Sequence, residues 1–206
     1  MRLQNPLSAI SPTLDMGVLF VLARADAEFT APTINALLPE GGSLAGVRKA
    51  LGRLVEQGIV ADKVAGRTHM YSLNREHLLA EAVLGLASAR DRLSERIRLA
   101  IDLWEFSPTV VTIFGSAARK DMRTDSDIDL FVGLSDETDD VLAETCVADL
   151  AGKVSIWTGN DARPLVYRAS EIAPAPIFDS IVAEGLTVYG DTNWLGRRLR
   201  EAKAAS

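Results

Sequence analysis

The sequence predicts an α+β protein of two modules joined by a connecting helix. Residues 1–74 combine three segments of helical periodicity with an alternating stretch that is typical of a β-hairpin. Residues 75–106 favour helix throughout. Residues 107–192 hold short β-branched runs, a glycine turn and paired aspartates, which indicate a mixed β-sheet with flanking helices. Residues 193–206 are expected to form a C-terminal helix or tail.

The composition is that of a soluble globular protein. The chain has 206 residues, 48% hydrophobic and 24% charged, enough for one medium or two small domains. It has no apolar run of about 18 residues and no signal peptide at its N-terminus, so we predict no membrane partner and a cytoplasmic location. A single cysteine, Cys146, excludes an internal disulfide. The net charge of −6 gives no global sign of nucleic-acid binding, so a local basic cluster must provide it.

The first module is predicted to hold three helices and a hairpin. Apolar residues at helical spacing predict a helix over Thr13–Ala25. Thr30 and Ser43 are expected to cap the next two helices, and Gly58 ends the third. The runs that follow, separated by Ala65-Gly66, predict two paired strands: Ile59–Val64 and Arg67–Leu73.

The third of these helices has an outward basic face. Between Gly42 and Arg75 only Glu56 and Asp62 oppose a group of basic residues, namely Arg48, Lys49, Arg53, Lys63, Arg67 and Arg75. Phosphate neutralisation needs such a cluster, and a helix in the major groove needs its long donors on the solvent face.

The stretches VRKALGRLVEQGIV and GRTHMYSLN resemble the winged helix-turn-helix of small bacterial transcription regulators. The resemblance implies that double-stranded DNA is a partner of residues 1–74. A winged helix used for dimerisation or domain docking, with an ordinary solvated basic face, remains the alternative. The DNA-binding positions that the resemblance implies are Ser43, Arg48, Lys49 and Arg53 on the helix and Arg67 and His69 on the wing.

An apolar stripe runs along the connector from Arg75 to Glu105. Gly85 and Ser88 are the points at which the helix would be interrupted, and Pro108 ends it. A stripe of this length is more often a core or a dimer seam than a ligand site, so a homodimer is possible and no chemistry is assigned to it.

The stretch from Val110 to Val132 carries the predicted chemistry. An apolar strand breaks at Gly115 and Ser116, and a second strand places Asp127 and Asp129 on one face, because side chains alternate along a strand. Adjacent carboxylates repel each other, and Mg²⁺ is the usual compensating ion. Gly115 would let backbone N–H groups approach a phosphate, and the Ser116 hydroxyl would add a donor.

This pattern of Gly-Ser, a spacer and Asp-x-Asp between apolar residues resembles the DNA polymerase beta-like nucleotidyltransferase superfamily in its minimal bacterial form. The resemblance extends over roughly Ser107 to Asp191 and implies a nucleotidyltransferase-like mixed sheet, an NTP substrate and Mg²⁺, with two metal ions possible. It makes Asp127 and Asp129 the metal-binding and catalytic residues. The nucleotide-binding residues that it implies are Gly115, Ser116, Arg119 and Ser126.

Two features depart from the family. Such enzymes usually place a third carboxylate on a later strand, whereas residues 163–167 contain no acid, so Asp161 is the candidate third catalytic residue. Lys120 stands where glycine is common in the family. The elements expected here are a helix over 137–151, strands over Lys153–Thr158 and Arg163–Tyr167, and a turn at 159–161.

Two functional hypotheses follow. The first is a Mg²⁺-dependent nucleotidyltransferase that moves a nucleoside monophosphate from an NTP to an acceptor, with a winged helix that binds DNA. The second is a DNA-binding transcriptional regulator whose nucleotidyltransferase-like domain senses a nucleotide or has lost its activity. The aspartate pair favours the first hypothesis, and the missing third acid and the winged helix favour the second.

Overall fold

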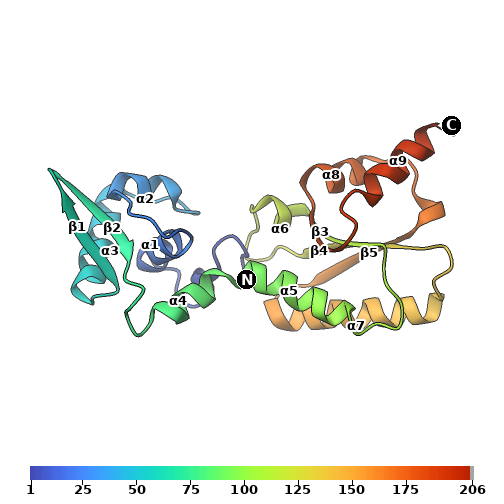
Figure 1. Ribbon diagram of the computed structural model, residues 1–206, viewed down its shortest axis with the longest axis horizontal. Helices are drawn as coiled ribbons and strands as arrows, with labels where there is room; N and C mark the ends of the chain where they lie inside the picture. The colour runs from blue at the N-terminus through green and yellow to red at the C-terminus, as the bar shows by residue number, and fades with distance from the viewer. Residues whose placement is uncertain (205–206) are drawn as a thin grey trace. The chain divides into compact units, whose positions relative to one another are not determined.

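The computed structural model describes residues 1–204 and contains two compact units, each with its own hydrophobic core (Figure 1). One unit is Gln4–Arg90, and the other joins Met1–Leu3 to Asp91–Ser206. Within the described range, no helix has both the length and the apolar character needed to cross a membrane.

The Gln4–Arg90 unit contains the three helices and the hairpin that the sequence predicts. Thr30 and Ser43 accept hydrogen bonds from the N–H groups of Thr33 and Gly46, as capping residues do. The helices bury Val18, Leu22 and other apolar residues in one core. The elements are a 3₁₀ turn η1 (Pro6–Ala9), α1 (Leu14–Ala23), α2 (Ala31–Leu37), α3 (Leu44–Glu56), β1 (Val60–Ala65), β2 (Thr68–Leu73) and α4 (Ala80–Ala87).

The connecting segment is interrupted at Ser88, one of the two residues that the sequence marks as points of interruption. The helix α4 ends at Ser88, whose hydroxyl donates to the Gly85 carbonyl at 3.0 Å, and a separate helix α5 (Ala89–Ile101) follows. Leu78, within the range of the predicted apolar stripe, precedes α4 and is 93% exposed. The boundary between the two units follows Arg90, so α4 belongs to one unit and most of α5 to the other.

The second unit is built on a four-stranded mixed sheet with helices on both faces (Figure 1). The strand order is β5-β4-β3-β6; β3 is antiparallel to both of its neighbours, and β4 is parallel to β5. The helices α5 and α7 pack on one face and α8 and α9 on the other. The bounds are β3 (Val110–Phe114), α6 (Gly115–Arg119), β4 (Ile128–Leu134), α7 (Asp140–Thr158), β5 (Ala162–Arg168), η2 (Ala169–Glu171), α8 (Pro176–Glu184), β6 (Leu186–Gly190) and α9 (Trp194–Ala204).

The predicted strand over Lys153–Thr158 is wrong, because α7 continues through it. Leu150, Val154 and Thr158 are buried at a spacing of four residues, whereas Ile156 is 83% exposed. The Thr158 hydroxyl donates back to the Val154 carbonyl, so the helix satisfies it. Gly159, with φ of 70°, then ends the helix in the left-handed region.

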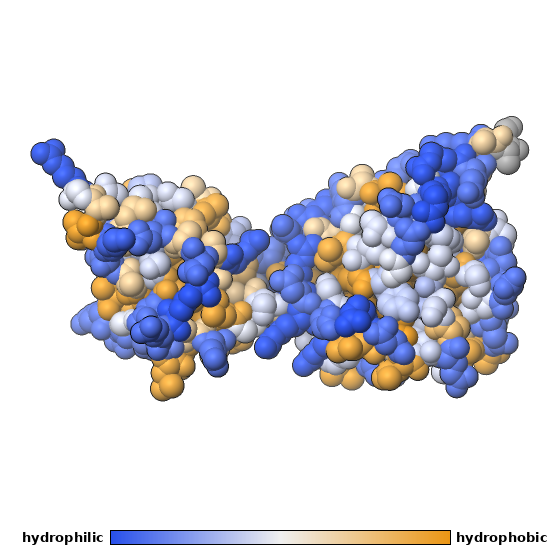
Figure 2. Space-filling view, in the orientation of Figure 1, coloured by the Kyte–Doolittle hydropathy of each residue, from blue (hydrophilic) through white to orange (hydrophobic). Residues whose placement is uncertain are grey.

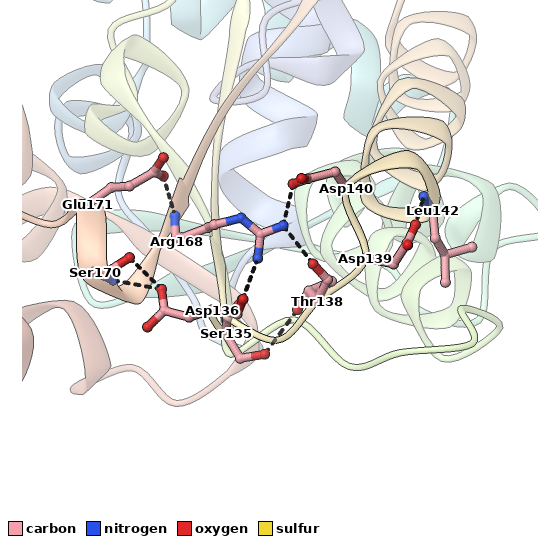
Figure 3. A network of polar contacts seen from close by, with 9 residues as sticks. All are labelled: Ser135, Asp136, Thr138, Asp139, Asp140, Leu142, Arg168, Ser170 and Glu171. Atoms are coloured by element: carbon pink, nitrogen blue, oxygen red, sulfur yellow. Dashed lines mark hydrogen bonds and ion pairs between the residues drawn. The ribbon is translucent and has the colours of Figure 1, made fainter.

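Arg168 at the end of β5 holds the loop that connects β4 to α7 (Figure 3). Its guanidinium donates to the carbonyls of Ser135 (3.0 Å), Asp136 (3.1 Å) and Thr138 (2.6 Å), and it also pairs with the Asp140 carboxylate. These bonds satisfy carbonyls that no strand or helix engages. One arginine therefore fixes the parallel connection between β4 and β5.

The last helix, α9, closes one face of the sheet. Trp194, Leu195 and Leu199 are buried with Phe131 beneath it. Figure 2 shows hydrophilic residues over the outside of α9. The expected C-terminal helix or tail is thus an amphipathic helix that covers the face of β4 on which Asp129 lies.

Candidate active site

The aspartate pair lies at the start of β4, where the strand enters the sheet. Ile128 and Leu130 are at most 1% exposed and point into the core with α5 and α7, so Asp127 and Asp129 share the opposite face. Asp129 lies across from Phe114, the last residue of β3. The end of one strand and the start of its neighbour thereby bring Gly115 beside the pair.

Gly115 is fitted to Asp129 in two ways. Its φ is +64°, in the left-handed region that side chains disfavour. A Cβ at this position would lie 2.3 Å from the Asp129 Oδ2, well inside contact distance. The turn therefore needs glycine both for its backbone and for the room that it leaves to the carboxylate.

Ser116 and Ser126 lie on the two segments that flank the pair. Ser116 belongs to the short helix α6, and its carbonyl accepts from Asp121 at 3.1 Å. The Ser126 hydroxyl accepts from the Arg123 N–H at 2.8 Å and so shapes the loop before β4. The predicted nucleotide contacts of both residues stay predictions.

Asn160 is a site residue that the sequence did not identify. It is 6% exposed, and its amide donates to the Ser126 carbonyl at 2.8 Å, just before Asp127. The Met1 ammonium in turn donates to the Asn160 amide oxygen. In the sequence this asparagine resembles any turn residue after Gly159, and only the fold, which brings the turn before β5 next to Ser126, reveals its role.

Arg163 is the second residue that the sequence missed. The parallel register places it directly opposite Asp129, on the face that carries the pair. Its Nη1 lies 2.7 Å from Asp127 Oδ2, with the arginine side chain 67% exposed and that of Asp127 25% exposed. A guanidinium thus occupies the strand position where a third acid was expected.

The negative charge of the Asp129 carboxylate is less well balanced by neighbouring positive charge than that of Asp127. Burial raises its pKa above the ordinary value, the Asp127 charge raises it further, and Arg163 and Arg119 oppose the rise. Within residues 1–204 no hydrogen bond or ion pair reaches this carboxylate, in contrast to Asp127. The two carboxylates, of which Asp127 alone has an ion pair within residues 1–204, offer the hard oxygen donors that suit Mg²⁺.

Arg119 lies at the end of α6 and is held by two acids. Its guanidinium contacts Asp121 at 3.2 Å and Glu184 at 3.3 Å, and these contacts raise its pKa further. Its positive charge also acts on Asp129. The predicted phosphate-binding arginine therefore lies close enough to the pair to influence it, but it starts from existing partners.

Asp161 lies in the turn before β5. Its carbonyl accepts from the Ile128 N–H at 2.8 Å, and the residue is exposed. In the part of the chain that the structure describes, no three His, Cys, Asp or Glu residues are grouped so as to hold a metal. Asp161 therefore does not complete a three-acid cluster with Asp127 and Asp129, and its role as a base stays a prediction.

The predicted DNA-binding residues lie on α3 and the hairpin. Arg48, Lys49 and Arg53 are exposed on α3, and Ser43 is its N-cap. Arg53 forms two hydrogen bonds with Asp15 of α1, at 3.1 and 2.7 Å.

The hairpin carries the other two predicted DNA-binding residues. His69 Nδ1 lies 2.8 Å from Asp62 on the paired strand β1, and Arg67 is exposed in the hairpin turn. Arg53 and His69 are thus engaged within the unit, while no ion pair in residues 1–204 engages Arg48, Lys49 or Arg67.

Comparison with known sequences gives one family match, and it lies in the second unit. Residues 101–192 match the sequence model of the family described as Polymerase beta, Nucleotidyltransferase. This part of the chain is therefore similar in sequence to nucleotidyltransferase domains. The match extends from the last residue of α5 to just before α9 and, except for Met1, contains the residues discussed around the aspartate pair. No curated relative matches the chain.

Solved structures with similarity to the chain include three toxin–antitoxin complexes. One, with AMP-PNP, has 17% identity and a TM-score of 0.41, covering 54% of this chain and 85% of that chain. The complex of the tri-AMPylated Shewanella oneidensis HEPN toxin with MNT antitoxin has 16% identity and a TM-score of 0.40, covering 56% of this chain and 85% of that chain. The toxin–antitoxin MntA-HepT has 16% identity and a TM-score of 0.37, covering 56% of this chain and 85% of that chain.

Proposed function

We propose that the nucleotidyltransferase domain transfers a nucleoside monophosphate from an NTP to an acceptor hydroxyl with Mg²⁺ as cofactor, releasing pyrophosphate. The observation that carries this proposal is that Asp127, just before β4, and Asp129, near its start, both lie beside Arg163, with Gly115 leaving room for the Asp129 carboxylate. Two such carboxylates repel the phosphates of an NTP unless a cation lies between the carboxylates and the phosphates.

The chain's residues would divide the work as follows. Asp127 and Asp129 would hold Mg²⁺, which when bound neutralises phosphate charge and polarises the phosphoryl group. The first N–H groups of α6, at Gly115 and Ser116, would donate to the triphosphate. Arg119 would exchange its exposed contacts with Asp121 and Glu184 for the departing pyrophosphate.

Radiolabelled NTPs test this proposal. The full chain, Mg²⁺ and cell extract are incubated with each α-labelled NTP, and we expect one class of acceptor to become labelled. The label should be lost with chelator and with the Asp127→Asn variant. Labelling that persists in Asp127→Asn would exclude the pair from the reaction.

A regulator without turnover is the second candidate, and Arg163 favours it. A guanidinium at the third acid's strand position removes a metal ligand and a base, and general-base catalysis is typically worth about 10²- to 10⁴-fold in rate. In that case the domain would bind an NTP with Mg²⁺ yet label no acceptor. Calorimetric binding without transfer to any extract component would support this candidate.

For the Gln4–Arg90 unit we propose double-stranded DNA binding through a winged helix-turn-helix. The unit holds eight basic and eight acidic residues, so binding would depend on local placement rather than net charge. Lys63 pairs with Glu28 and Arg75 with Asp26, and Arg53 is held by Asp15. The unpaired residues on α3 and the hairpin turn are the proposed phosphate contacts: Arg48, Lys49 and Arg67.

Salt dependence tests DNA binding. We expect the affinity of the full chain for duplex DNA to fall steeply with salt, and Arg48→Ala with Lys49→Ala to reduce the slope of log K against log salt by about two. Lys63→Ala is the matched control, because that lysine is already paired. No binding at low salt, or an equal effect of the control, would favour a docking or dimerisation module.

A further inference from the structure

Arg163 is a positive charge inside the aspartate site. Among residues 1–204 its one ion pair is with Asp127, and its side chain is 67% exposed. The register with Asp129 fixes where its backbone lies, while the exposed guanidinium is free to change partner. No other residue of β5 faces the pair with a charge, because Leu165 and Tyr167 follow on the same face.

The charges at this position limit how many cations the site can hold. Asp127 and Asp129 supply two negative charges, and Arg163 already returns one positive charge to the same face. Two divalent cations together with a guanidinium would place five positive charges against two carboxylates and the phosphates. A hard cation also needs oxygen ligands, and a third acid is missing from the cluster in residues 1–204.

We propose that the site takes one divalent cation with its nucleotide, and that the Arg163 guanidinium supplies the second positive charge. In the free protein the Arg163 guanidinium forms an ion pair with the Asp127 carboxylate. When the cation binds the pair, Arg163 is repelled from it and turns to the triphosphate, for which its planar donors are suited. This inference rests on the proposed function, because it assumes that an NTP is the ligand.

The exchange of partners predicts two effects of opposite sign for Arg163→Gln. Without nucleotide, Mn²⁺ should bind about tenfold more tightly, because a competing positive charge is gone from beside Asp127. With Mn²⁺ present, a non-hydrolysable ATP analogue should bind about tenfold more weakly, because a phosphate donor is lost. An ion pair with a merely structural role would give neither effect.

Calorimetry and manganese paramagnetic resonance on the full chain measure both affinities and the number of ions. With saturating ATP analogue we expect one bound Mn²⁺ per wild-type chain and per Arg163→Lys chain. Arg163→Asp, which restores an acid at this position, should bind two. Lys153→Gln removes the same charge from α7, on the other face of the sheet, and should match the wild type.

The outcomes separate the inference from the proposed function. Two Mn²⁺ ions in the wild type, or affinities that change in the same direction in Arg163→Gln, would overturn the one-cation inference and leave the nucleotidyltransferase proposal intact. Absence of Mn²⁺-dependent nucleotide binding in the wild type would overturn both. One ion in the wild type and two in Arg163→Asp would support the inference.

Discussion

Two arginines on the same strand show how different the two ends of β5 are. Arg163, near its start, has one ion pair and is 67% exposed. Arg168, at its end, is 20% exposed and donates to three backbone carbonyls as well as to Asp140. The first can leave its partner at little cost, whereas the second cannot leave without orphaning carbonyls.

The difference separates a functional charge from a structural one. Arg168 satisfies groups that belong to the fold, and the loop over 135–139 takes its shape from them (Figure 3). Arg163 faces Asp127 and Asp129, whose mutual repulsion is a property of a binding site. We therefore expect changes around Arg163 to alter binding and catalysis, and changes around Arg168 to alter stability.

The largest expected effect is on transfer at the Arg163 end. Asp127→Asn keeps the size of the side chain but removes a charged metal ligand, so we expect labelled nucleotide transfer to fall by at least about 10²-fold. The melting temperature should change little, because the ion pair that Asp127 forms within residues 1–204 is with the largely exposed Arg163 side chain. A variant that retains full transfer would contradict this assignment.

At the other end, Arg168→Gln should destabilise the domain. The substitution removes bonds to three carbonyls, and we expect the melting temperature to drop by about 5 °C. Tryptophan fluorescence isolates this unit, because all three tryptophans, at 104, 157 and 194, lie within it. Arg163→Gln is the matched control and should shift the melting temperature by no more than about 1 °C. Equal shifts in the two variants would break the distinction between the arginines.

A smaller effect is expected at the end of α6, next to the Arg163 site. Lys120 has φ of 65°, in the left-handed region where a side chain is strained. Lys120→Gly should stabilise the domain by about 0.5–1 kcal/mol in urea unfolding. Gly159→Ala, at the left-handed end of α7, should have the opposite sign. Destabilisation by Lys120→Gly would mean that the lysine side chain makes a compensating contact.

The smallest effect concerns the pH dependence of stability. Because the folded protein raises the pKa of Asp129, this group stabilises the fold below its ordinary pKa, and the contribution is lost as pH rises through the raised value. Asp129→Asn should therefore be more stable than the wild type at neutral pH, and the advantage should shrink as pH falls. Urea unfolding at several pH values measures it. An advantage that persists unchanged in acid would exclude burial of the charge as its cause.

The sequence was sufficient for the parts of the fold that local pattern determines. The alternation around Ile128 and Leu130 predicts the face of the aspartates, and the capping residues Thr30 and Ser43 mark their helices. The strand prediction for Lys153–Thr158 failed because Val154, Ile156 and Thr158 favour strands locally. Burial at a spacing of four residues, which depends on the sheet beneath, decides for helix.

The site needed information that the sequence does not contain. Arg163 reaches the aspartate pair through the register of β4 with β5. Asn160 holds the Ser126 carbonyl, from which 34 residues separate it in the chain. The ion pair of Arg53 with Asp15 likewise joins residues 38 positions apart. Asp15 lies outside the segment from 42 to 75, so a count of the charges in that segment does not include it.

The close approach of Gly115 to Asp129 should make these two positions change together during evolution. Since a Cβ at 115 would lie 2.3 Å from the Asp129 carboxylate, the glycine and the aspartate are coupled sterically across neighbouring strands. A descendant that lost Asp129 would no longer need glycine at 115 for that contact, whereas one that first lost the glycine would displace the carboxylate. In related chains we therefore expect larger residues at position 115 only where position 129 has ceased to be an acid.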